Sequence, residues 1–205
     1  MRDEGYIKFD CRWTRLPITI PPLLFSELNG WRDRLYRLGL IGAYPDGIGF
    51  GNLSARAGYQ REFWITSSST GHLDQLTPEH YARVTDFNVS KNKVWCWGGH
   101  KASSETMSHA VLYCCDRRIK AVAHVHNKLL WERLVNHVPT TAMDVLYGTP
   151  EMAYALQDLY NTTDLPQQKI LVMAGHQDGI VSFGNSIAEA SERVINLYKQ
   201  LRNDL

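Results

Sequence analysis

The sequence predicts an α/β fold: one domain over residues 1–205, with a mixed or antiparallel sheet flanked by helices. Short apolar runs typical of buried strands are interspersed with longer segments in which apolar residues recur every three or four positions. Some runs are separated by a helical segment and others only by a turn, which favours a mixed sheet. No repeat or linker divides the 205 residues, and 44% of them are hydrophobic, enough for one large core.

Six helices are expected from their start signals or from apolar spacing. Proline at the first helical position, serine or threonine caps, and a capping box mark most of these starts. The expected helices begin after Pro22, at Thr77, at Ser103 or Ser104, at Lys128, at Thr149 and at Ser186.

Five strands are expected where apolar residues run together. The last two flank a glycine-bearing turn, which predicts a hairpin. Segment 45–52 is rich in glycine and is expected to be a loop with close backbone approach. Segments 51–56 and 66–71 are rich in small hydroxyl and amide groups, which are equally common in loops that bind phosphate through backbone N–H groups and in plain turns. The expected strands cover residues 61–66, 93–97, 119–126, 170–174 and 180–183.

The charge balance argues against two classes of partner. The chain carries 22 basic and 21 acidic residues without a basic cluster, so nucleic-acid binding is not expected. The N-terminus lacks the pattern of a signal peptide, and no apolar run approaches the roughly 20 residues of a membrane helix. We therefore expect a cytoplasmic protein that does not bind membranes and keeps its four cysteines reduced.

Two histidines, His124 and His126, stand at alternate positions of an expected strand. Side chains two apart on a strand share a face, with Cα atoms roughly 6.5–7 Å apart, so both imidazoles can converge on one ion. His176 follows another apolar run and would complete a catalytic-type set of three ligands. The alternative is an ordinary polar pair on a half-exposed face. Three imidazoles favour zinc but also suit manganese, cobalt and iron.

A second polar cluster, Ser103-Ser104-Glu105, opens an expected helix. Serine hydroxyls and free N–H groups at a helix start can bind an anion such as phosphate. Glu105 is either the ordinary partner of the helix dipole or a general acid/base beside a metal-bound substrate. The remaining histidines are expected to be surface or capping residues: His72, His80, His100, His109 and His137.

Several motifs follow one another along the chain: residues 51–56, 65–66 leading to 70–71, 76–78, 103–105, 124–126 and 148–151, and His176 before Gly179. Taken in order, they resemble the motifs of the class II aldolase/adducin family. This family includes fuculose-phosphate and rhamnulose-phosphate aldolases, ribulose-phosphate 4-epimerases and methylthioribulose-phosphate dehydratases. The resemblance implies a mainly antiparallel sheet between two helix layers, and usually a homotetramer with active sites at subunit interfaces.

Carried over position by position, the resemblance implies a role for each motif residue. His124, His126 and His176 match the metal ligands, and Glu105 matches the catalytic acid/base. The loop 66–71 is longer than the common T-P-[ST]-G form, and G-H-Q-D-G replaces the usual N-H-G around His176. The residues that match phosphate-binding positions are Asn52, Thr70, Gly71, Ser103 and Ser104.

Together with these residues, the resemblance implies a metal-dependent lyase of the aldolase type. It would act on a small phosphorylated sugar or keto compound through a metal-stabilised enediolate. A dehydratase or a 4-epimerase of a sugar phosphate would use the same site. A non-catalytic assembly module, as in adducin, is a third hypothesis, although the presence of all three histidines and Glu105 favours an enzyme.

Overall fold

The computed structural model describes residues 6–58 and 61–203. One mixed sheet has the strand order β1-β7-β6-β5-β4-β8-β10-β9. β1 pairs in parallel with β7, and the other pairs of this sheet are antiparallel. Its strands are β1 (Asp10–Arg15), β4 (Asn52–Arg56), β5 (Phe63–Thr66), β6 (Tyr81–Asn88), β7 (Lys93–Gly98), β8 (Ala121–His126), β9 (Ile170–Val172) and β10 (Gly179–Gly184).

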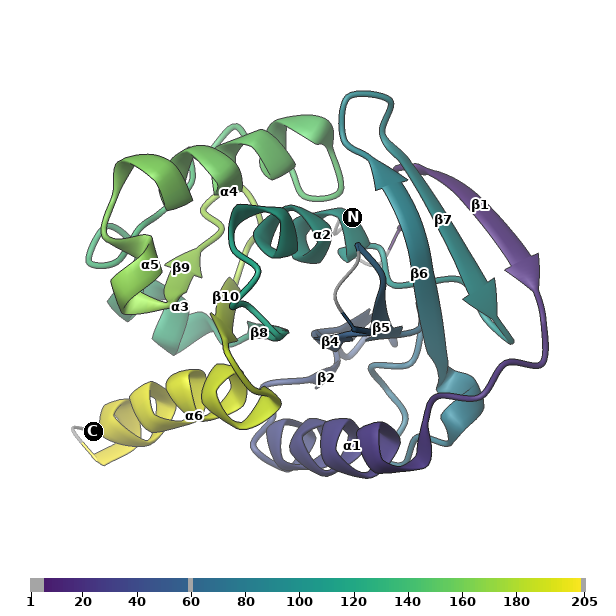
Figure 1. The fold of residues 1–205 in the computed structure, drawn as a ribbon. Helices are drawn as coiled ribbons and strands as arrows, with labels where there is room; N and C mark the ends of the chain where they lie inside the picture. The colour runs from purple at the N-terminus through teal and green to yellow at the C-terminus, as the bar shows by residue number, and fades with distance from the viewer. Residues whose placement is uncertain (1–5, 59–60, 204–205) are drawn as a thin grey trace.

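Helices cover both faces of this sheet (Figure 1). One layer packs through residues such as Leu28, Leu130 and Val194, and the other through residues such as Met107 and Leu156. The expected arrangement of a sheet between two helix layers is confirmed. The first layer consists of α1 (Pro22–Arg37), α3 (Lys128–Leu134) and α6 (Ile187–Asn203), and the second of α2 (Thr106–Cys115), α4 (Pro150–Thr162) and α5 (Leu165–Gln168).

Strand β8 shows how the sequence produces this arrangement. Ala123 and Val125 pack into the core beneath α1, α3 and α6, while Val122 packs into the core beneath α2 and α4. Side chains alternate between the faces of a strand, and both faces of this sheet are covered. Every residue of β8 is therefore buried, including its two histidines.

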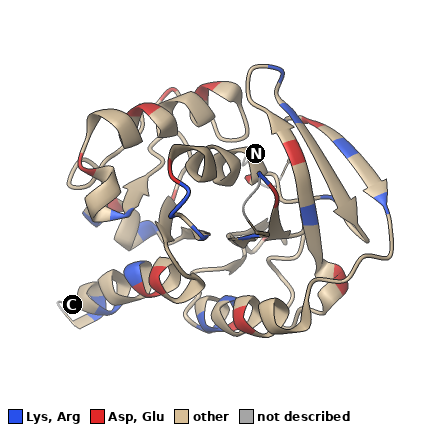
Figure 2. Cartoon of the chain, viewed as in Figure 1, with Lys and Arg blue, Asp and Glu red and all other residues tan. Residues whose placement is uncertain are grey.

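Charged residues of both signs are mixed over the visible elements. Figure 2 shows basic and acidic residues together on α1 and on α6. At the edge of the sheet, Lys93 of β7 lies 3.1 Å from the carboxylate of Asp10 on β1, a cross-strand pair. Within the part of the chain that the structure describes, no helix is long and apolar enough to cross a membrane.

Two segments expected to be loops contain strands. Residues 51–56, expected to be a loop, contain strand β4 in the middle of the sheet. The small polar residues of this strand made it look like a loop in the sequence. In the structure Leu53 and Ala55 face one core, and Ser54 faces α2. The expected loop 45–52 also contains β3 (Gly49–Phe50), which pairs with β2 (Gly42–Ala43) in a short ribbon.

The helix expected at Thr77 was wrong, because it is a single 3-10 turn, Pro78–His80. The capping box around this turn is present, but the following residues alternate between the core and a half-exposed face, which is strand periodicity. They extend as β6 between β5 and β7. Strand β1 was not expected at all, since its polar residues give little strand signal.

Candidate metal centre

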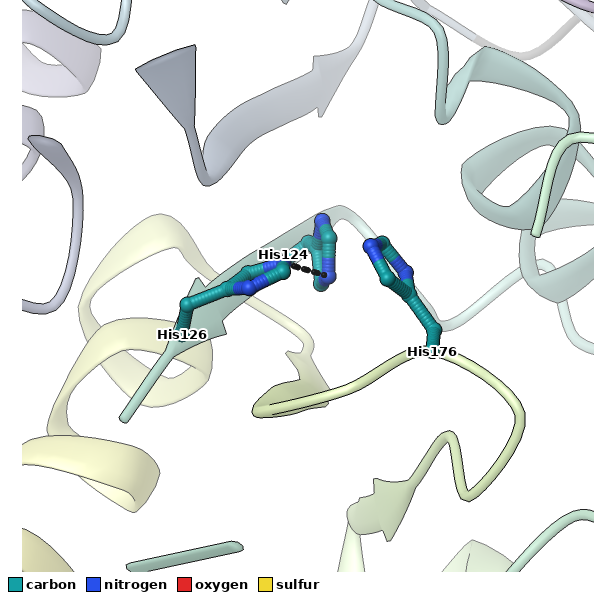
Figure 3. Close-up of side chains that lie close together, drawn as sticks. All are labelled: His124, His126 and His176. Carbon is teal, nitrogen blue, oxygen red and sulfur yellow. Dashed lines mark hydrogen bonds between the residues drawn. The ribbon is translucent and has the colours of Figure 1, made fainter. Parts of the chain in front are cut away.

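Three histidines meet where β8 ends beside the β9–β10 hairpin. His124 and His126 lie on the face of β8 that Val122 shares with α2. His176 lies in the turn before β10, and Gly179 at the start of β10 pairs with His126. The side chains of all three are almost fully buried, with exposed fractions between 1% and 3%. Figure 3 shows the three imidazoles pointing toward one another.

The spacing of the imidazoles suits a small ion. His124 Nε2 and His126 Nε2 lie 3.1 Å apart, and one nitrogen from each of the three rings lies within 4.8 Å of the others. Two nitrogens bound tetrahedrally at about 2.1 Å would lie roughly 3.4 Å apart. Burial, together with neighbouring His126 and His176, holds the pKa of His124 well below its usual value. A neutral imidazole is the form that binds a metal.

Two polar side chains contact the outer nitrogens of the strand histidines. Tyr44 Oη lies 2.8 Å from His126 Nδ1 and can accept a hydrogen bond from Nδ1–H. With the proton on Nδ1, the lone pair of Nε2 is available to an ion. Asn52 Nδ2 lies 3.3 Å from His124 Nδ1, and the buried Asn52 Oδ1 has no partner among the described residues. With the amide turned over, Oδ1 would accept from Nδ1–H, and His124 Nε2 would also be available to an ion.

Gly179 allows the turn to approach the imidazoles closely. A Cβ atom added at this position would lie 3.3 Å from His124 Nε2 and 3.2 Å from His176 Cγ. Both separations are tight for carbon, so a side chain here would displace a ring. The same atom would lie 3.0 Å from the carbonyl oxygen of His176, so the requirement for glycine comes from the backbone of this turn as well as from the imidazoles.

Glu105 reaches the same centre from the start of α2. Its Oε1 lies 3.7 Å from His176 Nδ1, its Oε2 accepts a hydrogen bond of 2.9 Å from Ser108 Oγ, and its side chain is 1% exposed. The expected serine cap is absent, because the helix begins at Thr106 with Glu105 in the cap position. Ser103 instead accepts from the Glu105 and Thr106 N–H groups, within the turn that precedes the helix.

A cavity of about 290 Å³ adjoins the metal centre. Asn52 belongs to both, since the β4–β8 register places it opposite His124. Among the described residues that line the cavity there is no lysine or arginine, so its polar groups are hydroxyls, the Asn52 amide, the His72 imidazole and backbone groups. All five residues matched to phosphate binding line it: Asn52, Thr70, Gly71, Ser103 and Ser104.

The N-terminal segment reaches the centre, which the sequence did not indicate. The ring of Tyr147 stacks on His176, with centroids 4.5 Å apart. Lys8 Nζ lies 3.9 Å from the centre of the Tyr147 ring, and the Tyr6 N–H donates to Tyr147 Oη at 3.3 Å. Such contacts between distant parts of a chain leave no periodic signal in the sequence.

The expectation that His109 is a surface or capping residue was wrong. It is fully buried, with Nδ1 2.7 Å from Ser54 Oγ, which in turn lies 2.7 Å from Tyr113 Oη. Burial lowers the pKa of His109 to about 3. The physical reason is that residues 106–113 of α2 are all buried, so every face of this part of the helix is covered. The other expectations hold: His72, His100 and His137 are exposed, and His80 accepts the Thr77 N–H.

Comparisons with solved structures return the same architecture. l-Fuculose-1-phosphate aldolase from Thermus thermophilus superimposes with a TM-score of 0.63 at 20% identity, over 87% of this chain and 91% of its own. YgbL from Escherichia coli, described as a putative aldolase/epimerase/decarboxylase, gives 0.65 at 19% identity, over 88% and 87%. A sugar-phosphate aldolase from Thermotoga maritima gives 0.61 at 16% identity, over 85% and 90%. At these identities the likeness establishes the fold.

The family itself is identified from the sequence. Among curated proteins, none matches this chain. The sequence model described as "Class II Aldolase and Adducin N-terminal domain" matches residues 43–203, which include all three histidines and Glu105. The protein therefore belongs to the class II aldolase and adducin family.

Proposed function

We propose that the protein is a metal-dependent lyase of the aldolase type that acts on a small phosphorylated sugar or keto compound. The observation that carries the proposal is the buried Glu105 carboxylate beside three converging histidines. Burying four ionisable side chains together costs folding free energy, and such clusters are concentrated at functional sites. An assembly module would have no need of this arrangement.

The ion would be held by His124, His126 and His176, with zinc expected before manganese, cobalt or iron. The short distance between the two strand imidazoles and the contacts that Tyr44 and Asn52 make with their outer nitrogens support this set. When bound, a divalent ion in such a site supplies Lewis-acid polarisation of substrate oxygens. Three protein ligands leave room for those oxygens.

Glu105 would transfer the proton. In aldol cleavage the carbon released from the broken C–C bond must be protonated, and the reverse reaction removes that proton again. Ser108 holds one carboxylate oxygen of Glu105, and the other lies on the side of His176. A carboxyl group fixed in this way can act as acid and base in turn.

The cavity would take the phosphate of the substrate. Ser103 and Ser104 lie just before the N-terminus of α2, where the helix dipole favours an anion. Thr70 and Gly71 line the same cavity from the loop that follows β5. Asn52 would contact the substrate between the phosphate and the metal.

The number of carbonyl products tests the reaction type. Zinc-loaded protein is incubated with a panel of phosphorylated ketoses, and released carbonyl compounds are identified by derivatisation and mass spectrometry. Cleavage gives two carbonyl products, whereas dehydration or epimerisation, the alternative chemistries of this site, leaves one. Chelator-treated protein is the control. Zinc-loaded protein that transforms none of the panel would favour the assembly module.

We infer in addition that the chain assembles as a homo-oligomer, with a tetramer expected. Leu129, Met143 and Leu146 are each more than half exposed, and exposed large apolar side chains favour a contact with another chain. Analytical ultracentrifugation would give the number of chains. The single domain over residues 1–205 and the cytoplasmic location stay predictions.

A further inference from the structure

The loop Thr70–Asp74 turns its carbonyl oxygens toward helix α1. The guanidinium of Arg32 donates to the carbonyl oxygens of Thr70 at 3.2 Å, Gly71 at 3.3 Å and Asp74 at 3.2 Å, and also to that of Leu73. Tyr36, one turn further along α1, donates from Oη to the carbonyl oxygen of His72 at 3.4 Å. Two side chains of one helix therefore bind five consecutive carbonyl groups.

Arg32 occupies a position that the helix pattern assigns to the core. Leu28, Arg32 and Leu35 lie on the buried stripe of α1, and Arg32 is only 1% exposed. Burial lowers the pKa of Arg32, and the carboxylate of Asp33, 3.7 Å away, acts in the opposite direction. An apolar residue would fill this position at lower cost in desolvation. The loop carbonyls account for the arginine.

The direction of the carbonyls fixes the direction of the neighbouring N–H groups. In a trans peptide unit the C=O and the following N–H point in opposite directions. Since the carbonyls of Thr70 and Gly71 face Arg32, the N–H groups of Gly71 and His72 face away from it. Within the described parts of the chain, neither N–H group donates to an acceptor. Both residues line the cavity, whereas Arg32 lies outside it.

The opposite side of the loop is fixed by the β2–β3 ribbon. A Cβ atom added to Gly71 would lie 2.6 Å from the carbonyl oxygen of Gly42 and 2.8 Å from the backbone nitrogen of Phe50. The loop is thus held between the ribbon and α1. Adjacent N–H groups held in one direction form a concave site that binds anions.

We propose that Arg32 is a positioning residue that sets the affinity of the cavity for an anion without touching it. It binds the loop carbonyls so that the N–H groups of Gly71 and His72 are presented to the phosphate of the substrate. This inference rests on the proposed function for the identity of the anion. The fixed orientation of the loop follows from the hydrogen bonds of Arg32 alone, whatever the anion is.

Inorganic phosphate is the probe for the test. Zinc-loaded wild type, Arg32→Met, Arg32→Lys and Arg37→Met are titrated with phosphate by calorimetry, and zinc per chain is measured on the same samples. Arg37 is an exposed residue of the same helix, so its variant controls for the change in charge. We expect phosphate binding weakened about tenfold or more in Arg32→Met, by less in Arg32→Lys, and unchanged in Arg37→Met, with zinc content constant.

A purely structural role for Arg32 would lower thermal stability and leave phosphate affinity unchanged. Folded Arg32→Met or Arg32→Lys protein that binds phosphate as tightly as wild type would overturn the inference. If neither variant folds, amide hydrogen exchange of the wild type provides the test. Phosphate should then slow the exchange of a peptide that covers residues 69–73. Unchanged exchange in that peptide would overturn the inference. Wild type that binds phosphate but transforms no ketose phosphate would count against the proposed reaction alone.

Discussion

The metal centre and the cavity beside it are built in opposite ways. The centre consists of side chains on strand β8 and on the turn before β10. The register of the buried sheet fixes His124 and His126, and backbone hydrogen bonds of the turn, to Met173 and from Gly179, hold His176. The cavity consists largely of backbone and hydroxyl groups on loops, and Arg32 and the β2–β3 ribbon hold its loop from outside. Changes at the centre should therefore alter metal binding or chemistry, and changes around the cavity should alter anion affinity.

The largest effect is expected from Glu105→Gln, which removes the acid/base but keeps the shape of the side chain. Turnover should fall by about 10²- to 10⁴-fold, while zinc content and phosphate affinity stay at the wild-type level. Steady-state kinetics with the substrate found in the panel measures turnover, elemental analysis measures zinc content, and calorimetry measures phosphate affinity. Glu79→Gln, at an exposed glutamate, is the control. Full activity in Glu105→Gln would assign proton transfer to another group.

Tyr44→Phe should weaken zinc binding by about 10- to 100-fold, because His126 Nδ1 loses the group that fixes its tautomer. Competition with a chromophoric chelator gives the affinity. Tyr154→Phe, at a half-exposed tyrosine on α4, is the matched control. Equal zinc affinity in Tyr44→Phe and wild type would show that this hydrogen bond does not support the ligand.

A pair of identical substitutions separates the two regions most sharply. Gly179→Ala should reduce zinc affinity, and Gly71→Ala should reduce phosphate affinity, each about tenfold, because the added methyl group meets the imidazoles in one case and the ribbon backbone in the other. Both affinities are measured on both variants. If each variant weakened the binding of zinc and of phosphate equally, the two regions would not be independent of each other.

The smallest effect is expected on the free energy of unfolding, through the buried His109. The pKa of His109 is about 3 in the folded chain, below the ordinary value of 6.5, so between about pH 3 and 6.5 the unfolded chain binds this proton and the folded chain does not. Lowering the pH from 7 to 6 should therefore cost about 0.7 kcal/mol of the free energy of unfolding through this residue alone. Denaturant unfolding of metal-free wild type and His109→Gln at both pH values measures the difference. His137→Gln, at an exposed histidine, should retain the full wild-type pH dependence.

The parts of the site that could be predicted are those carried by side chains in regular spacing. His124 and His126 share a face because strands alternate, and His176 follows an apolar run that forms β9. Glu105 stood out at the start of a helix, and the family resemblance supplied its role. Most helices likewise followed from apolar periodicity and caps such as Ser186, which accepts the Glu189 N–H at 3.0 Å, and the family resemblance supplied their arrangement in two layers.

What the sequence did not reveal depends on contacts between distant segments. Tyr44 and Arg32 act through hydrogen bonds to residues far along the chain, and neither stands in a motif. Strand β4 was not predicted because its small polar residues are also typical of turns. His109 is buried because its side of α2 packs on strand β4 at Ser54, a tertiary contact that no local pattern encodes.

The central claim is that His124, His126 and His176 form one metal site, and metal content tests it most directly. Wild type and His124→Ala are purified without added metal and analysed for metal per chain, with His137→Ala as the control at an exposed histidine. About one equivalent in wild type and in His137→Ala, and almost none in His124→Ala, is the expected result. Wild type that holds no metal even after reconstitution, or His124→Ala that holds as much as wild type, would contradict it.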